Sequence, residues 1–256
     1  MSQSSDTLTL PQDHIAGPDE ADRPRGTAAP GGSFSGSAVA EPPAVTAPAA
    51  AAATTPKPAT AAEKAARAVT DWHGLWARKR GADAWVKCVG IRGAYDADRR
   101  DRLGIYDDLF VLLIGKAVTK WRGSTDPGQY YIDHPMTPRG CAQLREGIHL
   151  FRPGLHRGHA AFVQAEDFHV NRLDRHGKVE SVDFGEFGIN LHSGGPGEEV
   201  DRYSAGCQIV RSPEGYFGAT WHRFYDPAAQ AMRDHKQGTL PYMLITAENL
   251  ASHPRG

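Results

Sequence analysis

Hydrophobic and polar residues alternate with a period of two along most of the chain after residue 83, and this pattern predicts a mainly β fold. Apolar runs such as WVKCVGI and LFVLLIG are separated by Gly, Asp and Lys, and turn signals such as RPG and RHG recur between them. Short strands with frequent turns are typical of a β-sandwich or a β-barrel. We assign this domain to residues 83–250 and expect its closing strand at 240–247.

Two segments have a different period and are predicted to be short peripheral helices. Residues 63–82 repeat apolar side chains at helical spacing and end in basic residues, which suits a helix packed on the domain. Residues 212–238 are predicted to be mostly helical, with Ser212 as the N-cap and a proline in the first turn. Pro227 is expected to divide this second segment into two helices.

Residues 1–62 consist largely of Ala, Pro, Thr, Gly and Ser, and they predict a disordered N-terminal tail. Such a composition cannot bury enough apolar surface to offset the entropy of ordering. The tail is interpreted as a spacer or as an address read by delivery machinery. Its start lacks a basic region followed by an apolar one, so we expect no Sec signal and synthesis in the cytoplasm.

Composition excludes several classes of function. The chain has 256 residues and a formal net charge of -1, which gives no basic excess for binding nucleic acid. No apolar run approaches the ~20 residues that cross a bilayer, so no integral membrane segment is expected. The three cysteines are too few for a disulfide framework, and reduced thiols are expected.

The segment INLHSGGPGEEVDRYSAGCQIV places His192 and Cys207 at the edges of two apolar runs joined by a polar loop. If the two runs are neighbouring strands, the imidazole and the thiol emerge at one edge of the sheet. A thiol attacks carbonyl carbon only as thiolate, and a nearby imidazole can take its proton. Gly206 allows backbone N–H groups to approach a substrate oxygen, and Ser193 and Ser204 can fix the imidazole and the backbone.

This segment resembles the active site of the L,D-transpeptidase (YkuD-like) catalytic domain family. The family pattern is a His, a dozen or so residues, and then Ser/Thr-His-Gly-Cys. The sequence is similar to a bacterial and phage-associated branch with Ser-Ala-Gly-Cys-Gln, and GSTDPGQYY, HPMTPRGCAQL, GLHRGHAAFVQ and FGINLHSGG also match. The resemblance covers residues 85–247.

The resemblance implies a mainly β YkuD-like domain and a cysteine acyl-enzyme acting on peptidoglycan stem peptides, with no cofactor or metal. Cys207 matches the nucleophile, His192 the residue that activates it, and Ser193 the neighbour whose backbone carbonyl orients the imidazole. Ala205 and Gly206 match the positions of the oxyanion amides. The family histidine is replaced here by Ala205, which keeps the backbone N–H but loses a side chain.

Other residues are candidates for the cleft, each with a plainer alternative. His156 and Arg157 lie in a turn that can reach the site, and Arg157 can pair with a stem-peptide carboxylate or stay in solvent. Gln208 supplies an amide contact or faces solvent on its strand. Tyr131 donates to an oxyanion or packs in the sheet. A zinc site at His192 and Cys207 lacks supporting ligand spacing.

The substrate lies outside the cytoplasm, so action at the cell wall or periplasm would require delivery by a non-Sec route, such as a phage or a secretion or injection system. Transpeptidase, carboxypeptidase and endopeptidase activities remain open. Two further alternatives are a catalytically silent wall-binding or virion module on the same scaffold, favoured by Ala205, and a cytosolic Cys–His enzyme with another substrate.

Overall fold

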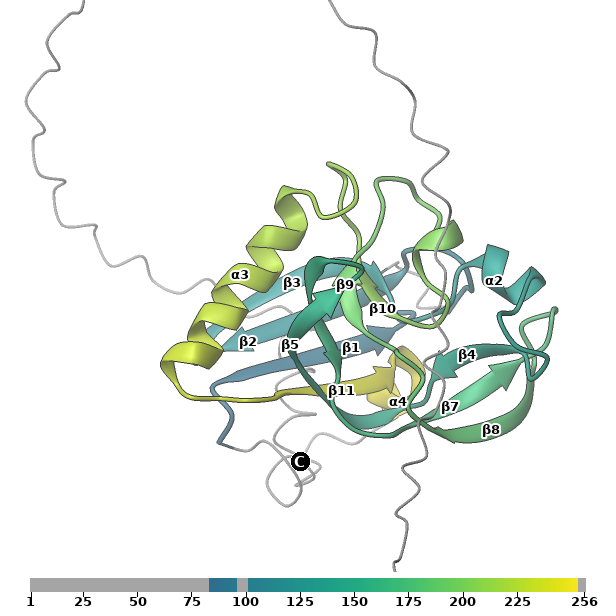
Figure 1. Cartoon of the computed structure of the whole chain (residues 1–256), viewed down its shortest axis with the longest axis horizontal. Helices are drawn as coiled ribbons and strands as arrows, with labels where there is room; N and C mark the ends of the chain where they lie inside the picture. Colours follow the sequence, from purple (N-terminus) through teal and green to yellow (C-terminus); the bar gives the residue numbers. More distant parts are fainter. Residues whose placement is uncertain (1–82, 96–100, 253–256) are drawn as a thin grey trace, which may run out of the picture. The chain divides into compact units, whose positions relative to one another are not determined.

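The computed structural model describes residues 83–95 and 101–252, and every element named below lies in these ranges (Figure 1). The tail predicted at 1–62 and the helix predicted at 63–82 lie outside the described residues.

Eight strands form a closed barrel, which confirms the mainly β prediction and selects a barrel over a sandwich. Their order around the barrel is β1-β11-β5-β6-β9-β10-β3-β2. Neighbours are antiparallel except for two parallel pairs, β1 with β11 and β9 with β10. The strands are β1 (Val86–Arg92), β2 (Asp108–Ile114), β3 (Ala117–Ser124), β5 (Gly147–His156), β6 (His159–Gln164), β9 (Leu191–Ser193), β10 (Gln208–Val210) and β11 (Leu240–Thr246).

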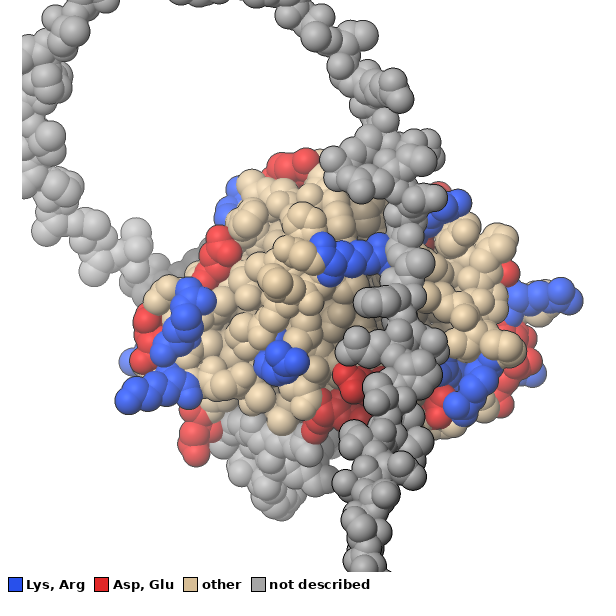
Figure 2. Space-filling model, viewed as in Figure 1, with Lys and Arg blue, Asp and Glu red and all other residues tan. Residues whose placement is uncertain are grey.

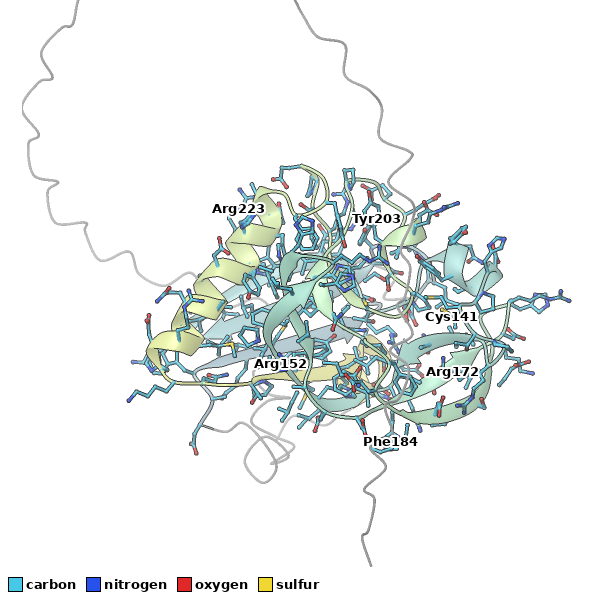
Figure 3. All side chains as sticks on the ribbon, viewed as in Figure 1. Cys141, Arg152, Arg172, Phe184, Tyr203 and Arg223 are labelled. Carbon is cyan, nitrogen blue, oxygen red and sulfur yellow. The ribbon has the colours of Figure 1, made fainter. Side chains whose placement is uncertain are left out.

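A smaller antiparallel sheet with the order β4-β7-β8 extends beside the barrel (Figure 1). It comprises β4 (Cys141–Leu144), β7 (Phe168–Leu173) and β8 (Val179–Gly185). Arg172 of β7 is held against this sheet by Asp183 of β8, with Nη2 3.0 Å from Oδ2. Figure 3 shows Arg172 and Phe184 on this sheet, remote from Arg223 on the long helix of the barrel.

The barrel interior is filled by aromatic and aliphatic side chains from every wall. Its largest fully buried members include Phe110, Phe151, Phe162, Tyr242 and Trp221. A second cluster lies on the other face of β1, β2 and β11, where Ala247 and Leu250 of α4 (Ala247–Ser252) contribute. Because β1, β2 and β11 bury side chains on both faces, their sequences are nearly continuous hydrophobic runs and do not alternate with polar residues.

The helix α3 (Ala219–Asp234) packs along the barrel, and it corrects the prediction of two helices broken at Pro227. Pro227 lies inside one continuous helix, and the helix begins after Gly218 and not at Ser212. A proline in a helix interior costs about 3 kcal/mol. Burial of Trp221, Phe224 and Met232 in the core holds the helix together despite that loss.

Two short helical elements flank the barrel: α2 (Gln129–Asp133) and the 3-10 helix η3 (Asp201–Tyr203). On the face in Figure 2, positive and negative residues are interspersed, and no patch of a single sign forms. Within the described residues, no helix has the length and apolar character needed to span a membrane.

Candidate active site

The parallel pair β9–β10 places His192 on one strand and the predicted cysteine just before its neighbour, and no hydrogen bond joins Cys207 Sγ to His192 Nε2 in the described residues. The register aligns Gln208 with Leu191 and Ile209 with His192. Cys207 therefore precedes β10 at the level where Asn190 precedes β9. A parallel pair needs a crossover connection, and residues 194–207 provide it. The polar loop seen in the sequence is thus the segment that returns the chain to the same end of the barrel.

The Cys207 sulfur lies against the start of β9. The backbone N–H of Asn190 donates to Sγ at 3.4 Å, and the thiol donates to the Gly188 carbonyl at 3.8 Å. The side chain is half-buried, whereas Cys88 and Cys141 are buried, and all three thiols are free. Burial raises the pKa of the Cys207 thiol to about 11, although the Asn190 N–H and Arg157 act to lower it. The resting thiol is therefore protonated at neutral pH.

The His192 imidazole is fixed in one tautomer. Its Nδ1–H donates to the backbone carbonyl of Ser193 at 2.7 Å, which leaves Nε2 with its lone pair. The ring is only 1% exposed, and Nε2 has no hydrogen-bond partner within the described ranges. Burial, followed by His156 and Arg157, lowers the pKa of His192 well below its usual range. A neutral imidazole with an unpartnered Nε2 is equipped to accept a proton.

Ser193 also ties the histidine to the loop before α3. Its Oγ donates to the Gly194 carbonyl at 3.1 Å and accepts the backbone N–H of Phe217 at 2.9 Å. Phe217 adopts a φ of 55°, and its ring is parallel to that of His159 at a centroid distance of 4.2 Å. The Ser193 carbonyl and hydroxyl together connect the imidazole to this aromatic loop.

A second histidine stacks on the first. The rings of His156 and His192 are 4.3 Å apart between centroids, with an interplanar angle of 13°. Asn190 Nδ2 donates to His156 Nδ1 at 3.0 Å, while Asn190 Oδ1 accepts the Gln164 N–H at 3.1 Å. Burial, then Arg157 and His159, lowers the pKa of His156 to about 4. Asn190 thus contacts both the nucleophile candidate and the stacked histidine.

Arg157 lies at the tip of the hairpin that carries His156. Arg157 and Gly158 have φ values of 51° and 81°, the positive angles of a two-residue hairpin turn. The guanidinium is exposed, and its charge lowers the pKa of both Cys207 and His192. The turn therefore lies near the site, and its exposed guanidinium leaves both alternatives for Arg157 open.

The backbone before Cys207 differs from the expected arrangement. Gly206 has a φ of 126°, and a Cβ there would lie 2.5 Å from the Ala142 carbonyl oxygen, so only glycine fits. Its N–H, expected to face a substrate oxygen, donates instead to Ser204 Oγ at 3.0 Å. Ser204 Oγ in turn donates to the Cys207 carbonyl at 2.8 Å. In the described part of the chain, the N–H groups of Ala205 and Cys207 have no acceptor, so these two amides, and not that of Gly206, are left without a partner.

Gln208 has neither of the two positions considered from the sequence. It is fully buried, with Nε2 3.3 Å from both the Thr125 and Gly206 carbonyls, and its Oε1 accepts the Tyr242 hydroxyl at 2.8 Å. It does not face solvent or a cleft. The Gly206 carbonyl and the Cys207 N–H belong to the same planar peptide group. The hydrogen bond from Gln208 to this carbonyl therefore also orients the Cys207 N–H.

Tyr131 and Ala205 belong to a neighbouring apolar cluster. Tyr131 is buried in α2 and packs with Cys141 and Leu173, which agrees with the packing alternative and not with an oxyanion donor. Ala205 packs against this cluster, and its carbonyl accepts the Cys141 thiol at 3.8 Å. Figure 3 shows Cys141 close to α2 and the small sheet.

Three residues of the site were not identified from the sequence: Asn190, Tyr216 and Phe217. Asn190 is two positions before His192 and shares its face of the strand, which is a usable signal. Tyr216 lies edge-on to His192 at 6.1 Å, and burial raises its pKa to about 12, with Cys207 near enough to contribute. Tyr216 and Phe217 were missed because 212–238 was interpreted as helical.

The structure does not support the zinc alternative. Among the described residues, one group of three potential metal ligands converges, and it consists of Asp101, Asp108 and Asp126. Neither His192 nor Cys207 belongs to it.

Comparisons of the chain with protein-family models, with curated proteins and with solved structures found no match. The fold is a mainly β barrel in which a half-buried thiol and a buried imidazole belong to neighbouring parallel strands.

Proposed function

We propose that this chain is a cysteine-dependent acyltransferase or peptidase of the L,D-transpeptidase type that acts on peptidoglycan stem peptides. The observation that carries the proposal is the fixed tautomer of His192. Its Nδ1–H is bound to the Ser193 carbonyl, and its Nε2 has no partner in the described residues. His192 lies on β9, the parallel neighbour of β10, which Cys207 immediately precedes. The sequence resemblance supplies the class of substrate.

Acylation would begin with a neutral thiol and a neutral imidazole. As Cys207 Sγ attacks the carbonyl carbon of a stem-peptide amide, the thiol proton passes to His192 Nε2, and a C–S bond forms. The tetrahedral oxyanion would be stabilised by the free N–H of Cys207. Collapse breaks the C–N bond, and the imidazolium returns the proton to the departing amine. The products are a thioester on Cys207 and a released D-amino acid.

Deacylation reverses the proton path with a new acceptor. An amine from another stem yields a cross-link, and water yields a shortened stem and a carboxylate. Attack on an existing cross-link would be an endopeptidase reaction. Arg157 is positioned to attract the stem-peptide carboxylate, because a guanidinium binds carboxylates in bidentate geometry.

The proposal is tested by incubating the purified full chain with disaccharide tetrapeptide and following product masses. We expect loss of one alanine, with a dimer appearing if an amine captures the thioester. Cys207→Ala should abolish the reaction, and a trapped adduct should map to Cys207 in the wild type. Cys88→Ala is the matched control, because it removes a thiol from the barrel core and leaves the site unchanged.

Other outcomes would decide between the alternatives. If the chain sediments with sacculi and leaves every mass unchanged, the wall-binding module replaces the enzyme. If it neither binds nor modifies this material, the peptidoglycan proposal is wrong and a different acyl substrate must be sought. Arg157→Asn should raise KM and leave kcat nearly unchanged if the guanidinium binds the substrate carboxylate.

A further inference from the structure

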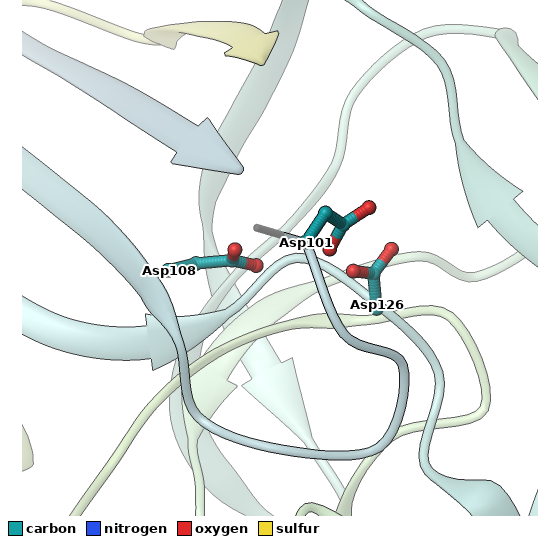
Figure 4. Close-up of side chains that lie close together, drawn as sticks. All are labelled: Asp101, Asp108 and Asp126. Carbon is teal, nitrogen blue, oxygen red and sulfur yellow. The ribbon is translucent and has the colours of Figure 1, made fainter. Parts of the chain in front are cut away.

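Three carboxylates converge near the start of β2 and the end of β3. Asp108 begins β2, Asp126 follows β3, and Asp101 lies in the segment leading into β2. Each offers an oxygen, and these oxygens all lie within 4.8 Å of one another. Figure 4 shows the carboxylates of Asp101 and Asp126 turned toward each other, with that of Asp108 directed to the same space. Asp108 and Asp126 are fully buried, while Asp101 is exposed.

Most of the inner oxygens are held by the protein. Both oxygens of Asp108 accept backbone N–H groups, from Gly93 and from Thr125. Asp126 Oδ1 accepts Gln143 Nε2 at 2.7 Å and lies 3.2 Å from Arg92 Nε. These contacts fix the two buried carboxylates before any ligand arrives.

One oxygen has no such partner. Asp126 Oδ2 is buried and has no hydrogen bond to any residue that the structure describes. An unpaired buried carboxylate oxygen carries a large desolvation cost. Among the described residues, Arg92 is the guanidinium that pairs with this cluster, and it does so at the other oxygen of Asp126, Oδ1. The buried oxygen without a partner is the observation that points to a cation.

We propose that Asp101, Asp108 and Asp126 form a binding site for a divalent cation, of which Ca²⁺ is the best fit. Hard cations prefer carboxylate oxygens, and Ca²⁺ is bound at roughly 2.3–2.6 Å, so opposite ligands lie about 5 Å apart. Mg²⁺, at about 2.0–2.1 Å, needs a tighter cluster. The exposed Asp101 gives the ion and its remaining water ligands access from solvent.

The test uses the full chain after chelation, titrated with CaCl₂ and separately with MgCl₂, with calorimetry and thermal unfolding as readouts. We expect heat of binding and a saturable rise in Tm with Ca²⁺, because a ligand that binds only the folded state stabilises it. Asp101→Asn should weaken Ca²⁺ binding by at least ~10-fold, since it removes one charged ligand at an exposed position. Asp126→Asn should do the same.

Two controls separate this site from other effects. Asp167→Asn removes an exposed carboxylate elsewhere and should keep the full Ca²⁺ response. Cys207→Ala should also keep it, so the result is independent of the proposed catalysis. The proposal is overturned if neither ion gives heat or a Tm shift up to about 10 mM, or if Asp101→Asn responds like the wild type. If Asp101→Asn or Asp126→Asn raises Tm, and Ca²⁺ changes the Tm of neither the variant nor the wild type, the carboxylates share a proton and bind no ion.

Discussion

The ring of His156 lies parallel to the ring of His192, with 4.3 Å between their centroids. Both pKa values are lowered, so the folded protein holds two neutral histidines that prefer to be charged in the unfolded chain. The stacked pair therefore links the site to the stability of the barrel.

The first prediction concerns stability at acidic pH. A histidine with a lowered pKa stabilises the folded state fully above the unfolded pKa of about 6.5, and this contribution is lost as the pH falls toward the folded value. We expect the free energy of unfolding to drop between pH 7 and pH 4 by about 1.4 kcal/mol per pH unit for each proton taken up. Urea unfolding over this range measures the slope.

His156→Phe keeps an aromatic ring stacked on His192 but removes one of the two titrating imidazoles. The free energy of unfolding of this variant should therefore fall less steeply with decreasing pH than that of the wild type. His176→Gln, at an exposed turn, is the control and should match the wild type. Equal slopes in all three proteins would contradict the assignment.

The second prediction concerns the reactivity of Cys207. Because its pKa is about 11, the thiolate fraction, and with it the rate of alkylation by iodoacetamide, should rise about tenfold per pH unit from pH 6 to 10. Mass spectrometry of the modified peptide measures the rate, with Cys88 and Cys141 as buried internal references. A plateau already reached at neutral pH would reveal a thiolate–imidazolium pair and refute the neutral pair described here.

The third prediction concerns Gln208. Gln208→Leu leaves the Gly206 carbonyl and the Tyr242 hydroxyl without their partner, and each unsatisfied buried group costs about 1–3 kcal/mol. We expect lower stability and also a lower kcat on disaccharide tetrapeptide, with KM little changed, because the peptide bearing the Cys207 N–H is no longer held.

Tyr242→Phe is the matched variant for Gln208. It removes a hydrogen bond from the other end of the same side chain and leaves the Gly206 contact in place. It should lower stability and spare kcat. Parallel losses of kcat in the two variants would show that Gln208 supports only the core.

The fourth prediction compares two glycines with positive φ. Gly215→Ala meets no atom within 4 Å, so it should cost only the strain of its φ of 109°, about 1–2 kcal/mol. Gly206→Ala adds a clash with the Ala142 carbonyl and should cost at least ~2 kcal/mol more. Chemical denaturation gives both values. Similar costs would mean that the backbone before Cys207 can move away from β4.

The sequence allowed Cys207 and His192 to be assigned to the edges of neighbouring strands, because both flank apolar runs joined by a loop. A direct contact between the thiol and the imidazole Nε2 stays a prediction. It could not predict which N–H groups remain free. Ser204 competes for the Gly206 amide, and that choice depends on φ angles and on the approach of Ala142. Gln208 was misjudged because a polar residue in a strand normally faces water. Closure of the barrel places Tyr242 of β11 against Gln208, and this buries the amide between the Tyr242 hydroxyl and the Gly206 carbonyl.

Helix α3 is a second case in which a local sequence signal is overridden by tertiary contacts. Pro227 is a strong local signal for a helix end, yet Trp221, Phe224 and Met232 supply tertiary burial that outweighs it. The metal candidate was also invisible in the sequence, since Asp101, Asp108 and Asp126 are separated by turns and strands whose pairing must be known first.

The barrel has few register pairs beside Cys207 and His192. β6 and β9 share a single register pair, Phe162 with Leu191, and β10 meets β3 through two, whereas β2 and β3 share seven. Backbone amides along β9 and β10 should therefore exchange with solvent deuterium sooner than those of β2. Local opening at β9 and β10 would expose the part of the wall that carries Cys207 and His192 while the remaining strands stay paired.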